Sequence, residues 1–130
     1  MEQVAIGPER EDVDPVPAPG AGCWVRGHLA RLGILERFDC LRCRDDVAHA
    51  KPEPDLYIAV LDCLGVTAAE AVAIEDSPNG VAAAKRAGMR CVAIPNSITA
   101  RLDLSQADLI LTTLAGISLT ALLERLTATP

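Results

Sequence analysis

Aromatic residues are nearly absent from this chain of 130 residues, which holds one Phe, one Tyr and one Trp. Stacking of bases on aromatic rings supports much of single-stranded nucleic-acid binding, so this scarcity argues against such a role. Half of the residues are hydrophobic. That is enough for one domain with a modest core built from Ala, Val, Leu and Ile.

A basic surface and a long apolar run are also lacking. The formal net charge is −6, so we expect no nucleic-acid partner and no attraction to anionic lipid. No apolar run reaches the ~18 residues that a membrane-spanning helix needs. The first residues are acidic, unlike the basic start of a signal peptide, and a cytoplasmic location is therefore expected. The acids gathered there are Glu2, Glu9, Glu11, Asp12 and Asp14.

The five cysteines are odd in number and scattered, which is typical of reduced thiols. Cys40 and Cys43 have the CxxC spacing of some zinc and redox sites. No second pair follows, and an offset of three along a strand directs two side chains to opposite faces. Buried free thiols are the expectation. His28 and His49 lack a Ser or Cys partner at a recognisable spacing and are expected to be ordinary surface or core residues.

Residues 1–22 differ in composition from the rest, with four prolines and three glycines. Proline disfavours helix interiors and central strands. We therefore predict a mostly disordered acidic arm over 1–22, with Val4–Ile6 as one short strand, and a folded domain over 23–130.

From Trp24 onward the pattern alternates between helices and strands, which predicts an α/β fold with a parallel sheet and flanking helices. Thr67 and Glu70 have capping-box spacing, so one short turn is expected there. The predicted elements are helix 24–32, strand 38–42, helix 54–64, strand 72–74, helix 78–87, strand 91–94, strand 109–111 and helix 117–126.

Two adjacent carboxylates, Glu75 and Asp76, come at the carboxyl end of a predicted strand, where open α/β sheets bind ligands. Such a pair can hold Mg²⁺, which prefers oxygen ligands. The free N–H groups of the helix that follows Ser77 favour an anion nearby, so a metal-bound phosphate would satisfy both. The alternative is that Asp76 and Ser77 only cap this helix.

A second segment, Ala50-Lys-Pro-Glu-Pro-Asp55, places Lys51 at the junction of an extended loop and a helix that begins with proline. There the ammonium group can meet a phosphate or a carboxylate. The alternative is an ordinary solvated lysine.

Together, residues 51–55 and 75–80 resemble the haloacid-dehalogenase-like hydrolases, most of all the capped sugar-phosphatase and phosphomutase branch. Residues 24–33 and 82–89 are similar to that branch too, so the resemblance runs from Trp24 to Leu114. It implies a Rossmann-like sheet in which Lys51 holds the phosphoryl group and steadies the nucleophile. It also implies Mg²⁺ at Glu75 and Asp76, and a small phosphorylated metabolite as substrate. Lys51, Ser77 and Asn79 are the expected substrate-binding residues.

The sequence departs from that family where the family's nucleophile lies, in an Asp-x-Asp-x-Thr motif after an apolar strand. Only Asp12-Val-Asp14 has the spacing, and it follows polar residues and precedes Pro15, so no nucleophile is assigned. Residues 17–22 lack the family's Ser or Thr, and the cap domain has no counterpart. The expected fold is therefore a partial sheet without its central nucleophile strand and cap.

Three alternatives remain open. The chain is a hydrolase, active alone or completed by another chain that supplies an aspartate. It is a non-catalytic module that keeps the phosphate and Mg²⁺ site. Or it is a truncated, catalytically impaired gene product, because without an aspartate no acyl-phosphate forms. A sheet that lacks its middle strands would have unpaired apolar edges, so self-association of the chain is also expected.

Overall fold

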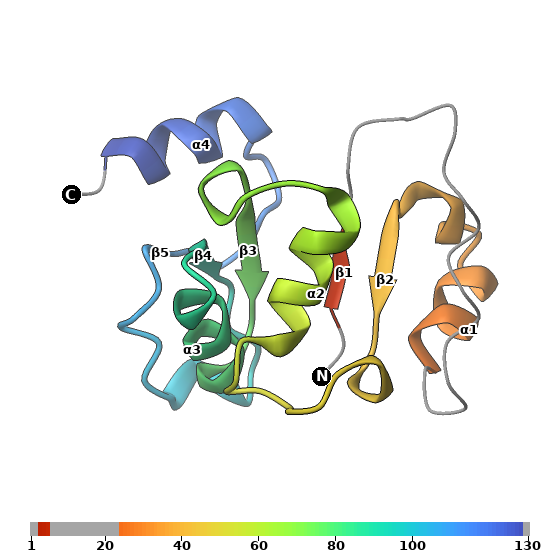
Figure 1. Ribbon diagram of the computed structural model, residues 1–130. Helices are drawn as coiled ribbons and strands as arrows, with labels where there is room; N and C mark the ends of the chain where they lie inside the picture. The colour runs from red at the N-terminus through yellow and green to blue at the C-terminus, as the bar shows by residue number, and fades with distance from the viewer. Residues whose placement is uncertain (1–2, 6–23, 129–130) are drawn as a thin grey trace.

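The computed structural model describes residues 3–5 and 24–128 and has an α/β architecture (Figure 1). Most of the predicted arm, including Ile6, lies outside the described residues. The strands are β1 (Gln3–Ala5), β2 (Cys40–Arg42), β3 (Val72–Glu75), β4 (Arg90–Ala93) and β5 (Leu109–Ile110). The helices are α1 (Trp24–Arg31), α2 (Asp55–Leu64), α3 (Pro78–Arg86) and α4 (Leu119–Ala128). Short 3-10 turns occupy Leu35–Arg37, Arg44–Asp46, Ala68–Glu70 and Thr99–Arg101.

The predicted parallel sheet is present and consists of β3, β4 and β5 in that order. Val72 lies opposite Arg90, and Val92 lies opposite Leu109. β2 belongs to a separate two-stranded ribbon in which it pairs antiparallel with β1. Within the described part of the chain, β2 and β3 therefore share no sheet.

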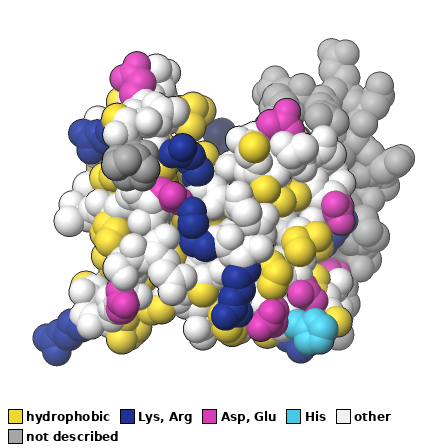
Figure 2. All heavy atoms as spheres, turned by 60° about the vertical axis from the view of Figure 1, so that its left-hand side comes forward, with side chains coloured by type: hydrophobic (Ala, Val, Ile, Leu, Met, Phe, Trp, Pro, Cys, Tyr) yellow, Lys and Arg dark blue, Asp and Glu magenta, His cyan; other side chains and the backbone are white. Residues whose placement is uncertain are grey.

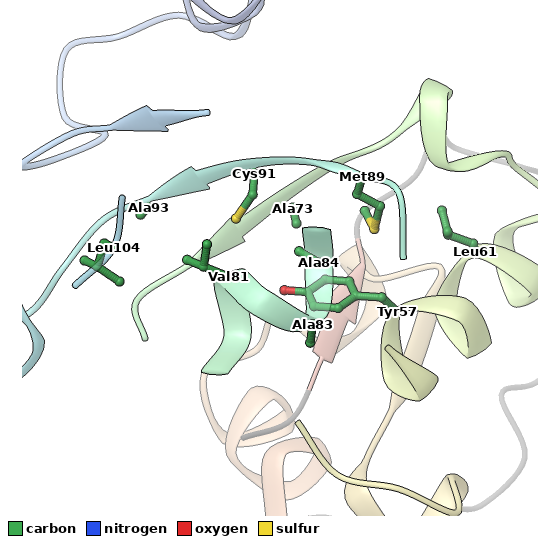
Figure 3. Packing of buried hydrophobic residues seen from close by; sticks show 10 residues of the cluster. All are labelled: Tyr57, Leu61, Ala73, Val81, Ala83, Ala84, Met89, Cys91, Ala93 and Leu104. Atoms are coloured by element: carbon green, nitrogen blue, oxygen red, sulfur yellow. The ribbon is translucent and has the colours of Figure 1, made fainter. Parts of the chain in front are cut away.

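Successive strand residues face opposite sides of the parallel sheet, and each side is covered by a different helix. Ala73 and Cys91 face α3 and pack against its small residues Ala83 and Ala84 (Figure 3). On the other side Val92 packs against Leu122 and Leu126 of α4, with Val72 and Leu109 beside them. The alternating pattern thus builds a layered arrangement with the sheet between α3 and α4.

Helix ends follow the predicted chemistry. Gly65 ends α2 with φ = 66°, a left-handed conformation that glycine adopts without strain. Thr67 and Glu70 form the predicted capping box. α4 begins at Leu119 rather than Ile117, because the Ser118 hydroxyl accepts a hydrogen bond from the Ala121 N–H at 3.2 Å and caps the helix there.

The expectation of reduced thiols is wrong for Cys40, Cys43 and Cys63. Cys40 on β2 forms a disulfide with Cys63 on α2, with their Cα atoms 6.3 Å apart. Cys43 is disulfide-bonded as well, and it packs with Leu29 and Leu41. Cys91 on β4 is free and buried, as expected. Spacing along the chain could not reveal the 40–63 pair, because only the packing of α2 on β2 brings these residues together.

None of the described helices has the length and apolar character needed to cross a membrane. Figure 2 shows Lys and Arg side chains following one another down the middle of the face that carries α3 and α4, with acidic side chains among them. On α3, Lys85 pairs with Asp108 across 2.7 Å, and Arg86 pairs with Glu53 across 3.2 Å.

Candidate functional site

The site lies where β3 ends and α3 begins. Ser77 is the N-cap of α3, and its hydroxyl accepts a hydrogen bond from the Gly80 N–H at 3.2 Å. Pro78 takes the first helical position, where its missing N–H leaves no donor unsatisfied. The remaining N–H groups of this first turn and the positive end of the helix dipole favour an anion. The predicted capping role of Ser77 is therefore confirmed, and it is compatible with a ligand site.

A pocket of ≈ 490 Å³ opens beside this helix start. Three of the predicted site residues, Lys51, Ser77 and Asn79, line it together although they come from two separate segments. Arg44 also lines it and was not predicted, since no pattern in the sequence relates it to Lys51. The other lining residues are Ala50, Leu56, Pro78 and Leu102.

Lys51 and Glu75 form a buried ion pair at this site. The Lys51 ammonium donates to Glu75 Oε1, and the two side chains are only 6% and 2% exposed. The Tyr57 hydroxyl donates to the same carboxylate oxygen. Figure 3 shows the Tyr57 ring extending from α2 with its hydroxyl toward α3. Lys51 is therefore not the solvated lysine of the alternative interpretation but a residue fixed in the folded core.

Gly80 makes room for this pair. A Cβ atom placed on Gly80 would lie 1.8 Å from Glu75 Oε2 and 2.1 Å from Glu75 Cδ. No carbon can approach so closely, so the Glu75 carboxylate occupies the space that a side chain at position 80 would take. This packing explains why the motif of residues 75–80 ends in a glycine.

Asp76 behaves differently from Glu75. Its Oδ2 accepts a hydrogen bond from Asn96 Nδ2 at 3.2 Å. Its Oδ1 is buried and has no hydrogen-bond partner among the described residues. Asn96 is itself held by Thr99, whose hydroxyl accepts from the Asn96 N–H at 3.0 Å. A buried carboxylate oxygen without a partner is costly unless a donor or a cation reaches it, so Asp76 fits a hard cation.

The Glu75 carboxylate, predicted as a metal ligand, already accepts hydrogen bonds from other groups of the protein. Its Oε1 is already engaged by Lys51 and Tyr57, while Oε2 lies 3.3 Å from the Asp76 N–H. Over residues 3–5 and 24–128, no group of three or more His, Cys, Asp or Glu side chains is arranged to hold an ion. A cation here would need its remaining ligands from phosphate and water, as Mg²⁺ commonly does.

The loop that carries Lys51 is held at both ends. Asp55 Oδ2 accepts from the His49 N–H at 3.1 Å and lies 3.0 Å from His49 Nδ1. The side-chain hydrogen bond with His49 lowers the pKa of Asp55 below its ordinary value. On the other side Arg86 Nη1 donates to the Pro52 carbonyl at 3.0 Å. His28 and His49 are both on the surface, as expected.

Cys91 lies close to this site on β4 but does not supply a nucleophile. Burial raises the pKa of its thiol to about 12, and the charges of Glu75 and Asp108 contribute to the same increase. The thiol stays protonated near neutral pH and packs as a small hydrophobic group.

Comparison with known proteins gives matches over the same segments. Residues 21–94 match the family described as haloacid dehalogenase-like hydrolase. YhcW of Bacillus subtilis (strain 168) is 45% identical over 103 residues, which cover 79% of this chain and 47% of YhcW. The validoxylamine A 7'-phosphate phosphatase of Streptomyces hygroscopicus subsp. limoneus is 36% identical over 96 residues, which cover 74% of this chain and 45% of that phosphatase.

Solved structures agree in fold. The crystal structure of CbbY from Rhodobacter sphaeroides in complex with phosphate superposes with a TM-score of 0.65 and 41% identity. The match covers 68% of this chain and 40% of CbbY. A mutant of CbbY has also been crystallised in complex with xylulose-(1,5)bisphosphate. The chain thus spans less than half the length of each of these relatives.

Proposed function

Because this chain belongs to the haloacid dehalogenase-like hydrolases, we propose that its pocket binds the phosphoryl group of a small phosphorylated metabolite. Lys51, Ser77 and Asn79 bind the phosphate, and Mg²⁺ lies against Asp76, with Glu75 as the second acid. The named relatives support this class of ligand, since one is a 7'-phosphate phosphatase and CbbY has been solved with phosphate and with a sugar bisphosphate.

One observation carries the proposal. Lys51 and the start of α3 are separated by more than twenty residues in sequence, yet they line one pocket. A fixed ammonium group opposite a helix N-terminus is a favourable environment for a phosphate, which accepts several charge-assisted hydrogen bonds. The ion pair with Glu75 holds the Lys51 ammonium in place at the pocket wall, so a phosphate would meet a fixed cation there.

The charges around the pocket support a divalent cation. Glu75 balances the charge of Lys51, and Asp76 adds a negative charge directly before Ser77, which lines the pocket. Mg²⁺ between the carboxylate and the phosphate would remove this repulsion and reach the unsatisfied Oδ1 of Asp76. When bound, the ion neutralises phosphoryl oxygens. The resemblance of residues 75–80 to this family likewise implies Mg²⁺ at Glu75 and Asp76.

We propose further that the described residues bind phosphate without hydrolysing it, as a non-catalytic or catalytically impaired site. The residues that line the pocket include no aspartate that could form an acyl-phosphate. The nearby Cys91 thiol is protonated. The competing proposal is a hydrolase completed by a second chain. It is favoured by the free edge of β3, which pairs only with β4 among the described strands.

Titration of the purified chain with inorganic phosphate in the presence of Mg²⁺, followed by ³¹P NMR and calorimetry, tests binding. We expect saturable binding that is lost in Lys51→Met and kept in Arg37→Gln, an exposed arginine outside the pocket. Binding that survives Lys51→Met would contradict the assignment. Hydrolysis of p-nitrophenyl phosphate should not exceed the buffer rate. Turnover that disappears in Lys51→Met would show instead a working phosphatase.

A further inference from the structure

The pocket contains a second cationic residue that the phosphate site does not use. Lys51 is buried and paired with Glu75, whereas Arg44 is exposed on the 3-10 turn that follows β2. Both line the same pocket. Among the described residues Arg44 takes part in none of the observed ion pairs. The pocket therefore offers two positive groups at different depths.

The guanidinium of Arg44 is anchored within its own turn. Nη1 donates to the Val47 carbonyl at 2.9 Å. An arginine has five N–H donors, so one bond of this kind orients the group and leaves a planar fork that matches carboxylate and phosphate. The nearby Asp46 does not form an ion pair with it; its Oδ2 accepts from the Cys43 N–H at 2.6 Å.

The rest of the pocket wall suits a carbon skeleton. Ala50, Leu56 and Leu102 contribute apolar surface. The volume of ≈ 490 Å³ falls in the ~300–1,000 Å³ range of sites for small organic ligands and exceeds what one phosphate fills. Two cations with apolar surface in one pocket fit a short molecule that carries an anionic group at each end.

We propose that Arg44 is a specificity-determining residue that binds a second anionic group of the ligand. The preferred ligand is then a small phosphorylated metabolite with a further phosphate or carboxylate. This inference rests on the proposed phosphate site at Lys51, which would hold the first phosphate.

Affinity for matched ligand pairs tests the inference in the presence of Mg²⁺. Fructose 1,6-bisphosphate against fructose 6-phosphate reports on a second phosphate. 3-Phosphoglycerate against glycerol 3-phosphate reports on a carboxylate. The wild-type chain should bind the doubly anionic member of at least one pair about tenfold more tightly, as expected for a charge-assisted bidentate contact. Arg44→Gln should reduce that preference to about twofold or less, a residual expected from long-range charge alone.

The controls separate this inference from the phosphate site. Arg37→Gln makes the same charge change outside the pocket and should keep the wild-type preference. Arg44→Gln should also keep its affinity for inorganic phosphate, which Lys51→Met loses. Equal binding of both members of each pair, or an unchanged preference in Arg44→Gln, would overturn the role of Arg44 alone. Failure of the wild-type chain to bind any of these ligands would overturn both proposals.

Discussion

The Lys51 ammonium binds the Glu75 carboxylate across 24 residues of sequence, and both groups are almost entirely buried. This pair joins the loop before α2 to the end of β3. The Tyr57 hydroxyl on α2 donates to the same carboxylate. The Glu75 carboxylate therefore connects three segments: the loop before α2, α2 itself and β3. The site is therefore part of the folded core, and its electrostatics and its stability are coupled.

Removing one partner of this pair should destabilise the protein strongly. Lys51→Met leaves the Glu75 carboxylate buried without its cation, and a loss of about 3–5 kcal/mol in the free energy of unfolding is expected. The double variant Lys51→Met/Glu75→Gln should recover part of it, because no charge is then buried. Urea denaturation measures both. The exposed pair of Arg86 and Glu53 is the control, and Glu53→Gln should change stability by less than about 0.5 kcal/mol. Equal losses of stability in Lys51→Met and Glu53→Gln would show that burial of the Lys51–Glu75 pair contributes nothing to its effect on stability.

Gly80→Ala should disturb both stability and phosphate binding. The added methyl would lie 1.8 Å from Glu75 Oε2, so the carboxylate must move and its bonds to Lys51 and Tyr57 must change. We expect a loss of about 2 kcal/mol, in the range of overpacked core substitutions, and weaker phosphate binding. Gly27→Ala on α1 is the matched control, because nothing lies within 4 Å of a Cβ atom placed on Gly27. That change should be neutral or stabilise by up to about 1 kcal/mol. A stable Gly80→Ala variant with full phosphate affinity would disprove the close packing.

Mg²⁺ should raise the melting temperature in the presence of phosphate. Ligands that bind the folded state stabilise it by mass action, and Asp76 Oδ1 lacks another partner among the described residues. Asp76→Asn should abolish the increase, whereas Asp62→Asn at an exposed position of α2 should keep it. Differential scanning fluorimetry over a Mg²⁺ series measures the shift. A melting temperature independent of Mg²⁺ in the wild-type chain would argue against the metal site.

Asp108 should make stability fall in acid. Partial burial opposes its ionisation, but the hydrogen bonds from Lys85 and from the Cys91 N–H hold the pKa of Asp108 below its usual value. A depressed pKa in the folded state adds stability above the unfolded value of about 4, and this stability is lost as pH falls through the folded pKa. Asp108→Asn should therefore be less stable than wild type by about 1 kcal/mol at pH 7. The two stabilities should converge as the pH falls through the folded-state pKa of Asp108. A constant difference across this range would exclude Asp108 as the titrating group.

Hydrogen exchange should divide the chain into two parts. Amides of β3 and β4 belong to a parallel sheet covered by α3 and α4, whereas β2 pairs only with the three residues of β1 among the described strands. Protection should be higher in residues 72–75 and 90–93 than in residues 40–42. The Cys40–Cys63 disulfide ties β2 to α2, so the contrast should increase after reduction. Uniform protection before and after reduction would mean that both sheets unfold as one unit.

Local sequence determined most of the helices and strands. It also determined the start of α3, which forms one side of the site. The alternating apolar pattern, Gly65, Ser77 and Pro78 placed the helices and strands within a few residues, because capping and periodicity depend on neighbours along the chain. The sequence motifs also predict Lys51, Ser77 and Asn79 as site residues, and these three line one pocket.

Only the tertiary structure decided how these groups are used. In the folded protein Lys51 and Glu75 form a buried ion pair, and the close approach of Gly80 leaves space for the Glu75 carboxylate. The same is true of Arg44 at the pocket and of the bridge between Cys40 and Cys63. The reason is physical: these relations join residues that lie far apart in sequence, and their distances and burial depend on how α2 packs between the two sheets, which no local pattern encodes.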